Sequence, residues 1–344
     1  MNNKLSQISF LNYLKGVSIT AIIFYHLIYN FMQVPNIIKT ASSFGGAGVH
    51  IFFFCSGFGL YWSYLKKGFE VKTYIWKRIK RLYVPYICII LISFLIPFMF
   101  EGQNRSIALL SHIFLFKMFM PEYEESFGIQ MWYISTIIQF YFIYPVLLKL
   151  VKKIRINNLL IFSILVSLLW AIFISFFGLD SERIWSSFFL QYLWEFVLGM
   201  FIAEKSYKNS KILKKDIKSI WYIIIFLISF SIFALMSIKG GILKNFNDVF
   251  SALSFGSLCI ILYKFKVFRN VFDYLGRISY ELYLVHYLIY MCVFKLIKMP
   301  SYINAIIAII LSVIIAITYN YVINNLSDIL EKKYNIKFIK KKTI

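Results

Sequence analysis

Acidic residues are scarce in this sequence: Asp and Glu number 15 among 344 residues, against 37 Lys and Arg, for a formal charge of +22. In a soluble chain such an excess would indicate a nucleic-acid partner. Here the basic residues stand in short stretches between apolar runs, and the mean hydropathy is +0.73. The charge therefore indicates membrane topology and contact with membrane lipids, and we expect no nucleic-acid partner.

Cysteine and the common catalytic motifs are also sparse. The chain has no P-loop, no G-x-S-x-G elbow and no H-E-x-x-H, so ATP-driven transport and serine hydrolysis have no support. It also lacks a cleavable signal peptide and a Pro/Gly/Ser-rich linker, which predicts one integral domain. We expect neither disulfides nor a metal site, because all four cysteines fall inside apolar runs without metal-ligand spacing: Cys55, Cys88, Cys259 and Cys292.

Long apolar runs, by contrast, recur along the whole chain. Each approaches the roughly 20 residues that a membrane-crossing helix needs, and the alternating pattern of a membrane β-barrel is absent. We therefore predict an all-α integral membrane protein of about ten transmembrane helices, over 10–31, 44–65, 82–100, 131–151, 157–177, 185–204, 219–238, 248–265, 276–297 and 303–325.

Charge predicts how these spans are oriented. The stretch 66–81 has seven basic residues and one acid, and 152–155, 205–218 and 264–269 are also basic. The positive-inside rule places all of them in the cytoplasm. They fall on one side only if the short run 108–120 does not cross, but is re-entrant or lies at the outer interface. Both termini are then cytoplasmic.

Two titratable residues share the first apolar run. Lys15 and His26 are eleven positions apart, which returns to within roughly 20° of the same helix face, about 16 Å further along the axis. Polar groups at membrane depth are expensive and call for a functional hypothesis. The alternative is that Lys15 snorkels to the interface and His26 bonds another helix.

The stretch 45–62, GGAGVHIFFFCSGFGLYW, is rich in small residues. Its glycines and Ser56 allow close helix packing, or they break the helix where it lines a cavity. His50 in the same stretch is either a second ionisable group at the site of His26 or a satisfied interfacial histidine.

Arginine is rare, with 30 Lys against seven Arg, yet Arg78 and Arg81 stand three apart on one expected helix face. Guanidinium groups bind phosphate bidentately, so the pair favours an anion site. Ordinary positive-inside charge is the alternative.

Three further groups lie near or within later spans. His286 is near mid-membrane on the ninth span, and Arg277 and Glu281 stand four apart toward its cytoplasmic end, where they would pair. Glu195 is a carboxylate within the sixth span. It would orient a histidine, neutralise Lys15, or serve as a structural ion partner.

Four stretches together resemble the membrane-bound acyltransferase-3 family, which includes O-acetyltransferases of bacterial surface polysaccharides. They are LNYLKGVSITAIIFYH (11–26), GVHIFFFCSGFGL (48–60), RIKR with VPY (78–86) and LGRISYELYLVH (275–286). The stretch 131–147, beginning with Met131-Trp132, is similar to the family's fourth-span pattern. The chain departs from the family in having Lys15 where most members have Arg, His50 where many have an acid, and isoleucine at 137–138 where many have Glu.

The resemblance implies a multi-pass cell-membrane enzyme that moves an acetyl or other short acyl group from cytoplasmic acyl-CoA to a hydroxyl of a surface or lipid-linked glycan. His26 would be the general base or carry the acyl group, and Lys15 would line the donor path. Acetyl-CoA would be a co-substrate, with no permanently bound cofactor. The implied acyl-CoA-binding residues are Arg78, Arg81, Ser56 and Gly57, and the implied supporting residues are Glu195, His286, His50 and Trp132.

We expect residues 1–330 to form this single transmembrane domain and 331–344 a basic cytoplasmic tail. Many relatives carry a fused extracytoplasmic SGNH domain. None is expected here, so the enzyme would act alone or with a separate extracytoplasmic protein. The alternative function is a transporter or flippase for a glycan or lipid-linked sugar, and a weaker one is another class of multispan acyltransferase with a buried histidine.

Overall fold

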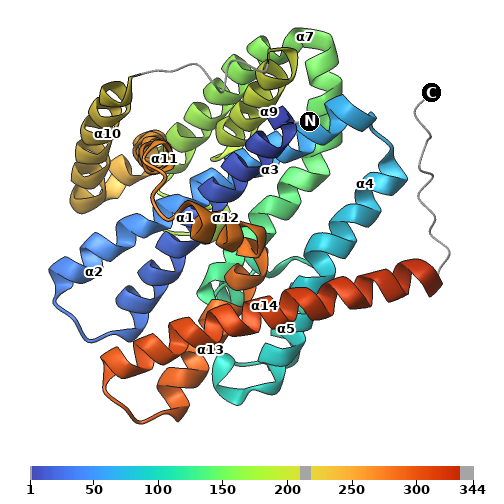
Figure 1. The fold of residues 1–344 in the computed structure, drawn as a ribbon. Coiled ribbons are helices and arrows are strands. Elements are labelled where there is room, and N and C mark those ends of the chain that lie inside the picture. Colours follow the sequence, from blue (N-terminus) through green and yellow to red (C-terminus); the bar gives the residue numbers. More distant parts are fainter. Residues whose placement is uncertain (1, 210–217, 334–344) are drawn as a thin grey trace.

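Helices make up all of the regular structure in the computed structural model of this chain, which describes residues 2–209 and 218–333. Figure 1 shows them as a bundle with α1 (Asn2–Phe31) near its centre. The expectation of an all-α chain is thus confirmed for these residues. Most of the predicted basic tail, from residue 334 on, and positions 210–217 lie outside the described residues.

Every predicted apolar run contains a helix. Two runs, 131–151 and 157–177, correspond to the two helices that make up α7 (Trp132–Phe176) and meet at a kink at Arg155, where φ is 64° and ψ is 154°. The other runs correspond to α1 and to α3 (Gly48–Lys67), α5 (Val84–Leu95), α9 (Leu193–Lys208), α10 (Ser219–Lys239), α11 (Asp248–Lys264), α13 (Ser279–Leu296) and α14 (Ser301–Lys333).

Several of these helices can cross a membrane by length and composition. Five such segments occur among the described residues: Ser9–Phe31, Asn36–Lys67, Ile129–Phe176, Ser219–Lys239 and Ser301–Leu326. The chain is therefore a multi-pass membrane protein. The total of ten crossings and the cytoplasmic placement of both termini remain predictions.

The third predicted span is assembled from consecutive pieces. α4 (Val71–Arg78) continues through a π-helical turn, Ile79–Tyr83, directly into α5. Pro85 lies within this continuous stretch and has no N–H to donate, so one helical hydrogen bond is missing directly after the π-helical turn. The π turn carries Arg81, and such turns occur frequently at functional sites.

The run 108–120 is too short to cross. Its helix α6 (Arg105–Ile113) has nine residues, or about 14 Å at 1.5 Å per residue, against a hydrocarbon core of about 30 Å. Its ends are fastened to α5: Arg105 donates to the carbonyls of Phe94 and Ile96 at 2.6 and 2.5 Å, and His112 Nδ1 lies 2.6 Å from the Tyr86 hydroxyl.

Glycines set the closest helix packing in the bundle. A Cβ at Gly57 of α3 would lie 1.9 Å from the carbonyl oxygen of Phe196 in α9, and a Cβ at Gly199 of α9 would lie 2.1 Å from that of Phe54. α3 continues through Ser56 and Gly57 without interruption. Close packing is confirmed for Gly57, and a helix break at Ser56 and Gly57 is wrong. At the start of the stretch, Gly45 and Gly46 lie in a 3-10 turn before α3, and Gly45 lines an apolar pocket.

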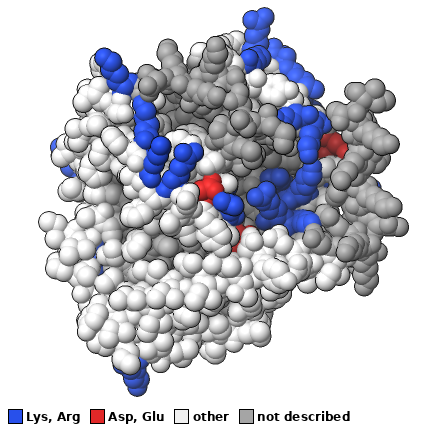
Figure 2. All heavy atoms as spheres, viewed as in Figure 1, with Lys and Arg blue, Asp and Glu red and all other residues white. Residues whose placement is uncertain are grey.

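Charge divides the bundle into two ends. Lys66 and Lys67 end α3, Lys77 lies in the last turn of α4, and Lys205 and Lys208 end α9. Figure 2 shows Lys and Arg gathered over the upper half of the molecule and almost none below. We call this the basic end. The opposite end is where α1, α5 and α13 finish.

The glycine contact predicts a position-specific loss of stability. Gly57→Ala should destabilise the protein by about 1–3 kcal/mol, because the new methyl group would overlap the α9 backbone. Gly59→Ala, two residues along the same helix with open space around it, is the matched control and should be neutral or slightly stabilising. Thermal unfolding in detergent measures both; equal midpoints would contradict the close packing.

Candidate active site

Two histidines from distant parts of the sequence meet between α1 and α13. The ring centroids of His26 and His286 lie 5.3 Å apart, with their planes at 88°. Both side chains are buried, with 7% and 0% of their surface exposed. The group beside His26, which helix geometry left open, is therefore His286.

These histidines keep ring nitrogens that the protein does not use. His286 Nδ1 lies 3.1 Å from the carbonyl oxygen of Leu282, which can only accept, so Nδ1 carries the proton. A neutral ring then leaves Nε2 with a free lone pair. His286 Nε2 and His26 Nδ1 are both buried, and neither has a hydrogen-bond partner among the described residues. Buried polar atoms of this kind are uncommon and need an explanation.

Tyrosines surround the pair. The ring centroid of Tyr25 lies 4.8 Å from that of His26, and those of Tyr283 and Tyr290 lie 5.8 and 5.6 Å from that of His286. Tyr283 also donates its hydroxyl to the backbone carbonyl of Gln130, at the start of α7. Aromatic rings thus surround the histidines, and Tyr283 connects them to the polar residue Gln130 toward the opposite end.

Lys15 lies on α1 on the side of His26 that faces the basic end. It interacts electrostatically with Arg81 on the π turn and with Glu281 on α13. The expected pairing of Arg277 with Glu281 is wrong, because Arg277 instead binds Asp273 one turn earlier, at 2.5 Å. The Glu281 carboxylate instead interacts with Asn320 and, electrostatically, with Arg81 and Lys15.

The two arginines of the predicted anion site have different surroundings. Arg81 is exposed, whereas Arg78 is half-buried against the rings of Tyr74 and Tyr141, at 5.8 and 5.2 Å. The Nε atom of Arg78 is buried without a partner. The structure thus brings Arg81 toward Lys15 and holds Arg78 in an aromatic cradle one turn away.

Glu195 orients a histidine, but that histidine is His50. Glu195 Oε1 lies 2.8 Å from His50 Nδ1, and Asp248 Oδ1 lies 3.8 Å from His50 Nε2. Gln191 donates to the other oxygen of Asp248 at 2.7 Å. Of the readings of His50, the satisfied histidine fits these contacts. Neutralisation of Lys15 by Glu195 is not what the structure shows.

Comparison with known proteins decides the family. A family model described as an acyltransferase domain matches residues 8–323, nearly the whole chain. No curated protein and no solved structure matches the chain significantly.

The chain belongs to the acyltransferase 3 family.

Membership implies acyltransferase activity, with an acyl donor and an acceptor. The residues that carried the sequence resemblance gather in two places along α1 and α13 of this family member. His26 and His286 lie toward the opposite end, and Lys15 and Arg81 toward the basic end. Ser56 on α3 interacts with Tyr133, whose ring centroid is 5.3 Å from that of Tyr283.

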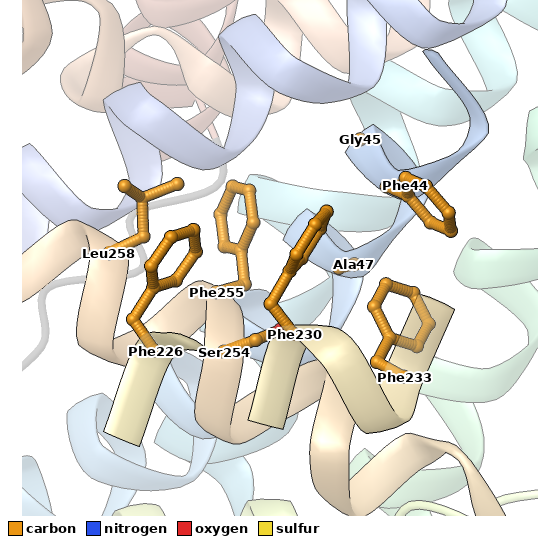
Figure 3. A pocket seen from close by; sticks show the side chains of 9 residues that line it. All are labelled: Phe44, Gly45, Ala47, Phe226, Phe230, Phe233, Ser254, Phe255 and Leu258. Carbon is orange, nitrogen blue, oxygen red and sulfur yellow. The ribbon is translucent and has the colours of Figure 1, made fainter. Parts of the chain in front are cut away.

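One apolar pocket among the described residues lies elsewhere (Figure 3). It has a volume of about 190 Å³ and lies between α10, α11 and the turn Phe44–Ala47. None of the predicted site residues lines it; its walls are mainly phenylalanine side chains, among them Phe226, Phe230, Phe233 and Phe255. Among the described residues, no group of three or more His, Cys, Asp or Glu could hold a metal ion.

Several polar residues at the opposite end were missed from the sequence. Arg183 Nε lies 3.2 Å from Glu124 Oε1, and its guanidinium lies 5.5 Å from the ring of Trp132. Lys117 is 1% exposed and its ammonium has no hydrogen-bond partner. Burial lowers the pKa of Lys117 to about 7. The acidic composition of 121–130 indicated a polar segment at this end, but nothing in the sequence indicated that Lys117 is buried.

The His50–Glu195 pair predicts non-additive stability effects. Removing one partner, as in His50→Ala, leaves a buried group unpaired and should destabilise the protein by about 3–5 kcal/mol. His50→Ala with Glu195→Ala should lose clearly less than the sum of the single variants. Thermal unfolding of the four proteins measures the coupling, and additive losses would show that the pair contributes no interaction.

Lys117 predicts a rise of stability with pH. With a pKa of about 7 in the folded protein, against about 10.4 when unfolded, the unfolded chain binds more protons between these values. Stability should therefore increase by up to about 1 kcal/mol per pH unit across this window.

Lys117→Met should flatten that increase, and the exposed Lys298→Met should not. The groups facing Lys117 are Glu124, Glu125, Arg183 and His112, and they are common to wild type and variant. Melting temperatures from pH 7 to pH 10 give the comparison. Parallel curves for wild type and Lys117→Met would contradict a neutral buried lysine.

Proposed function

We propose that this protein is an O-acyltransferase of the cell membrane. It moves an acetyl or other short acyl group from acyl-CoA, bound at the basic end, to a hydroxyl of a cell-surface or lipid-linked glycan at the opposite end. The observation that carries the proposal is the buried pair His26 and His286, whose unpartnered ring nitrogens lie on the same two helices, α1 and α13, as Lys15 and Glu281.

The donor binds at the basic end. Guanidinium groups match phosphate oxygens bidentately, so Arg78 and Arg81 hold the CoA phosphates, with neighbouring lysines adding attraction. Exposure of Arg81 and the unpartnered Nε of Arg78 support this assignment. Gly57 contributes by bringing α9 against α3, and Ser56 lies beside the rings that lead to His286.

The acyl group then reaches His26. The eleven residues from Lys15 to His26 span about 16 Å, a distance that suits the extended thioester arm of CoA. Lys15 lines this path at its lower end. Ring contacts run along this path, from Tyr133 to Tyr283 and from Tyr283 to His286.

His26 acts as general base. It removes the proton from the acceptor hydroxyl as the oxygen attacks the thioester carbonyl, and the C–S bond breaks. The proton passes from His26 to the departing CoA thiolate, which gives the ester and free CoA. In a two-step variant, His26 carries the acyl group between donor and acceptor. His286, fixed by Leu282, faces the base.

The second candidate is a transporter or flippase for a glycan or lipid-linked sugar, because buried ionisable groups in a multispan bundle are also typical of transporters. No internal repeat is evident in the sequence, and the arginine pair indicates an anionic donor. Labelled acetyl-CoA added to inverted vesicles separates the two: label appearing on an acceptor supports the enzyme, and movement of unmodified glycan supports the transporter.

His26 gives the sharpest prediction for the enzyme. His26→Ala should abolish acylation of the surface glycan, because it removes the proposed base. Among the described residues, no other buried ring nitrogen lies beside His286 to replace it. Mass spectrometry of glycans from a deletion strain, complemented with wild type or variant, measures it. His112→Ala is a control, since His112 is engaged by Tyr86 and Ser126. Retained acylation with normal levels of the variant protein would rule out the catalytic role of His26.

A further inference from the structure

A half-exposed rim lies beyond the histidines at the opposite end. It consists of Trp132 at the start of α7, Arg183 at the start of α8 (Arg183–Ser186) and Glu124 in the segment before α7. The side chains of Arg183 and Glu124 are 42% and 29% exposed, and Trp132 is half-buried. The rim thus combines an indole ring, with the Arg183 guanidinium 5.5 Å from its centroid, and a partly exposed ion pair.

The rim is connected to the histidines by direct contacts. Ring centroids lie 6.4 Å apart from Trp132 to Tyr133, 5.3 Å from Tyr133 to Tyr283, and 5.8 Å from Tyr283 to His286. Arg183 also interacts electrostatically with Tyr283 and with Tyr25, the neighbours of the two histidines. The rim and the histidines therefore belong to one continuous region.

Unused hydrogen-bonding groups lie in the same region. Gln130 is 1% exposed, and within the described part of the chain both polar atoms of its amide lack a partner, although its backbone carbonyl accepts from Tyr283. The buried ammonium of Lys117 is also unpartnered and interacts electrostatically with Glu124 and Arg183. Unpartnered polar groups with such burial are costly unless something else satisfies them.

We propose that Trp132, Arg183 and Glu124 form the acceptor subsite and that it takes a neutral pyranose. This inference rests on the proposed function and deepens it by naming the acceptor class. The indole face packs against the apolar C–H face of a sugar ring. Arg183 donates to sugar hydroxyls and Glu124 accepts from them, as charge-assisted hydrogen bonds.

Charge around the rim selects a neutral sugar. Glu122 and Glu125 flank Glu124 and are exposed, while Arg183 is already engaged by Glu124. A phosphate- or carboxylate-bearing polymer would meet these carboxylates and be repelled. A neutral ring with adjacent hydroxyls would instead use both the donors and the acceptors of the ion pair.

The test measures acceptor and donor dependence separately. Full-length protein is reconstituted in vesicles with labelled acetyl-CoA, and the acceptor probe is neutral surface polysaccharide isolated from a strain lacking this gene. Arg183→Ala and Trp132→Ala should each raise the acceptor KM by about tenfold, and the KM for acetyl-CoA should stay within about twofold. Trp132→Phe should recover much of the loss, because it keeps an aromatic face.

Lys295→Ala is the matched control, since Lys295 forms an exposed ion pair with Glu101 at 3.5 Å at the same end of the bundle. Its acceptor KM should equal that of wild type. Melting temperatures check that each variant is folded.

Three results would contradict the proposal, and they are distinguishable. An unchanged acceptor KM in the folded variants overturns the subsite alone. A phosphate-bearing polysaccharide accepted as well as the neutral one overturns the choice of a neutral sugar. Failure of wild-type protein to transfer label to any acceptor overturns the proposed function and the subsite with it.

Discussion

The energetic penalty for burying an ionisable side chain among apolar helices organises this structure. Most such groups are compensated: His50 by Glu195, His112 by Tyr86 and Ser126, and Arg105 by backbone carbonyls. His26 and His286 are not, since each keeps a buried ring nitrogen that has no partner in residues 2–209 and 218–333. The bundle supplies hydrogen-bond partners to its other histidines and leaves one ring nitrogen of each of these two unpaired. The most direct explanation is that a substrate bonds to these nitrogens.

The two helices that carry this pair also connect the ends of the molecule. α1 brings Lys15 toward Arg81 and His26 toward His286, and α13 supplies Glu281 to the first cluster and His286 to the second. In the proposed function, the first cluster receives a donor with anionic phosphates and a long arm, and the second receives a hydroxyl acceptor. The free lone pair of His286 follows from one backbone contact, the hydrogen bond to Leu282.

Local patterns in the sequence predicted the helices and the members of the site, and failed where partners come from distant segments. The eleven-residue spacing placed Lys15 and His26 correctly on one helix, but no spacing could pair His26 with His286, some 260 residues away. Glu195 proved to be the partner of His50, and Arg277 of Asp273, because tertiary packing and one turn of α12 (Arg269–Arg277) decided between equally charged candidates. The role of Gly57 could not be decided from the sequence for the same reason, since only the position of α9 shows that Gly57 packs against another helix.

Transfer of the acyl group across the bundle is measured most directly by supplying the donor and the acceptor on opposite faces of the membrane. Purified protein is reconstituted in one orientation, labelled acetyl-CoA is supplied to one face, and glycan acceptor to the other. The account predicts that label reaches the acceptor only when acetyl-CoA contacts the basic end and the acceptor the opposite end. Equal transfer in the reversed arrangement, or transfer only when both substrates share one face, would contradict it.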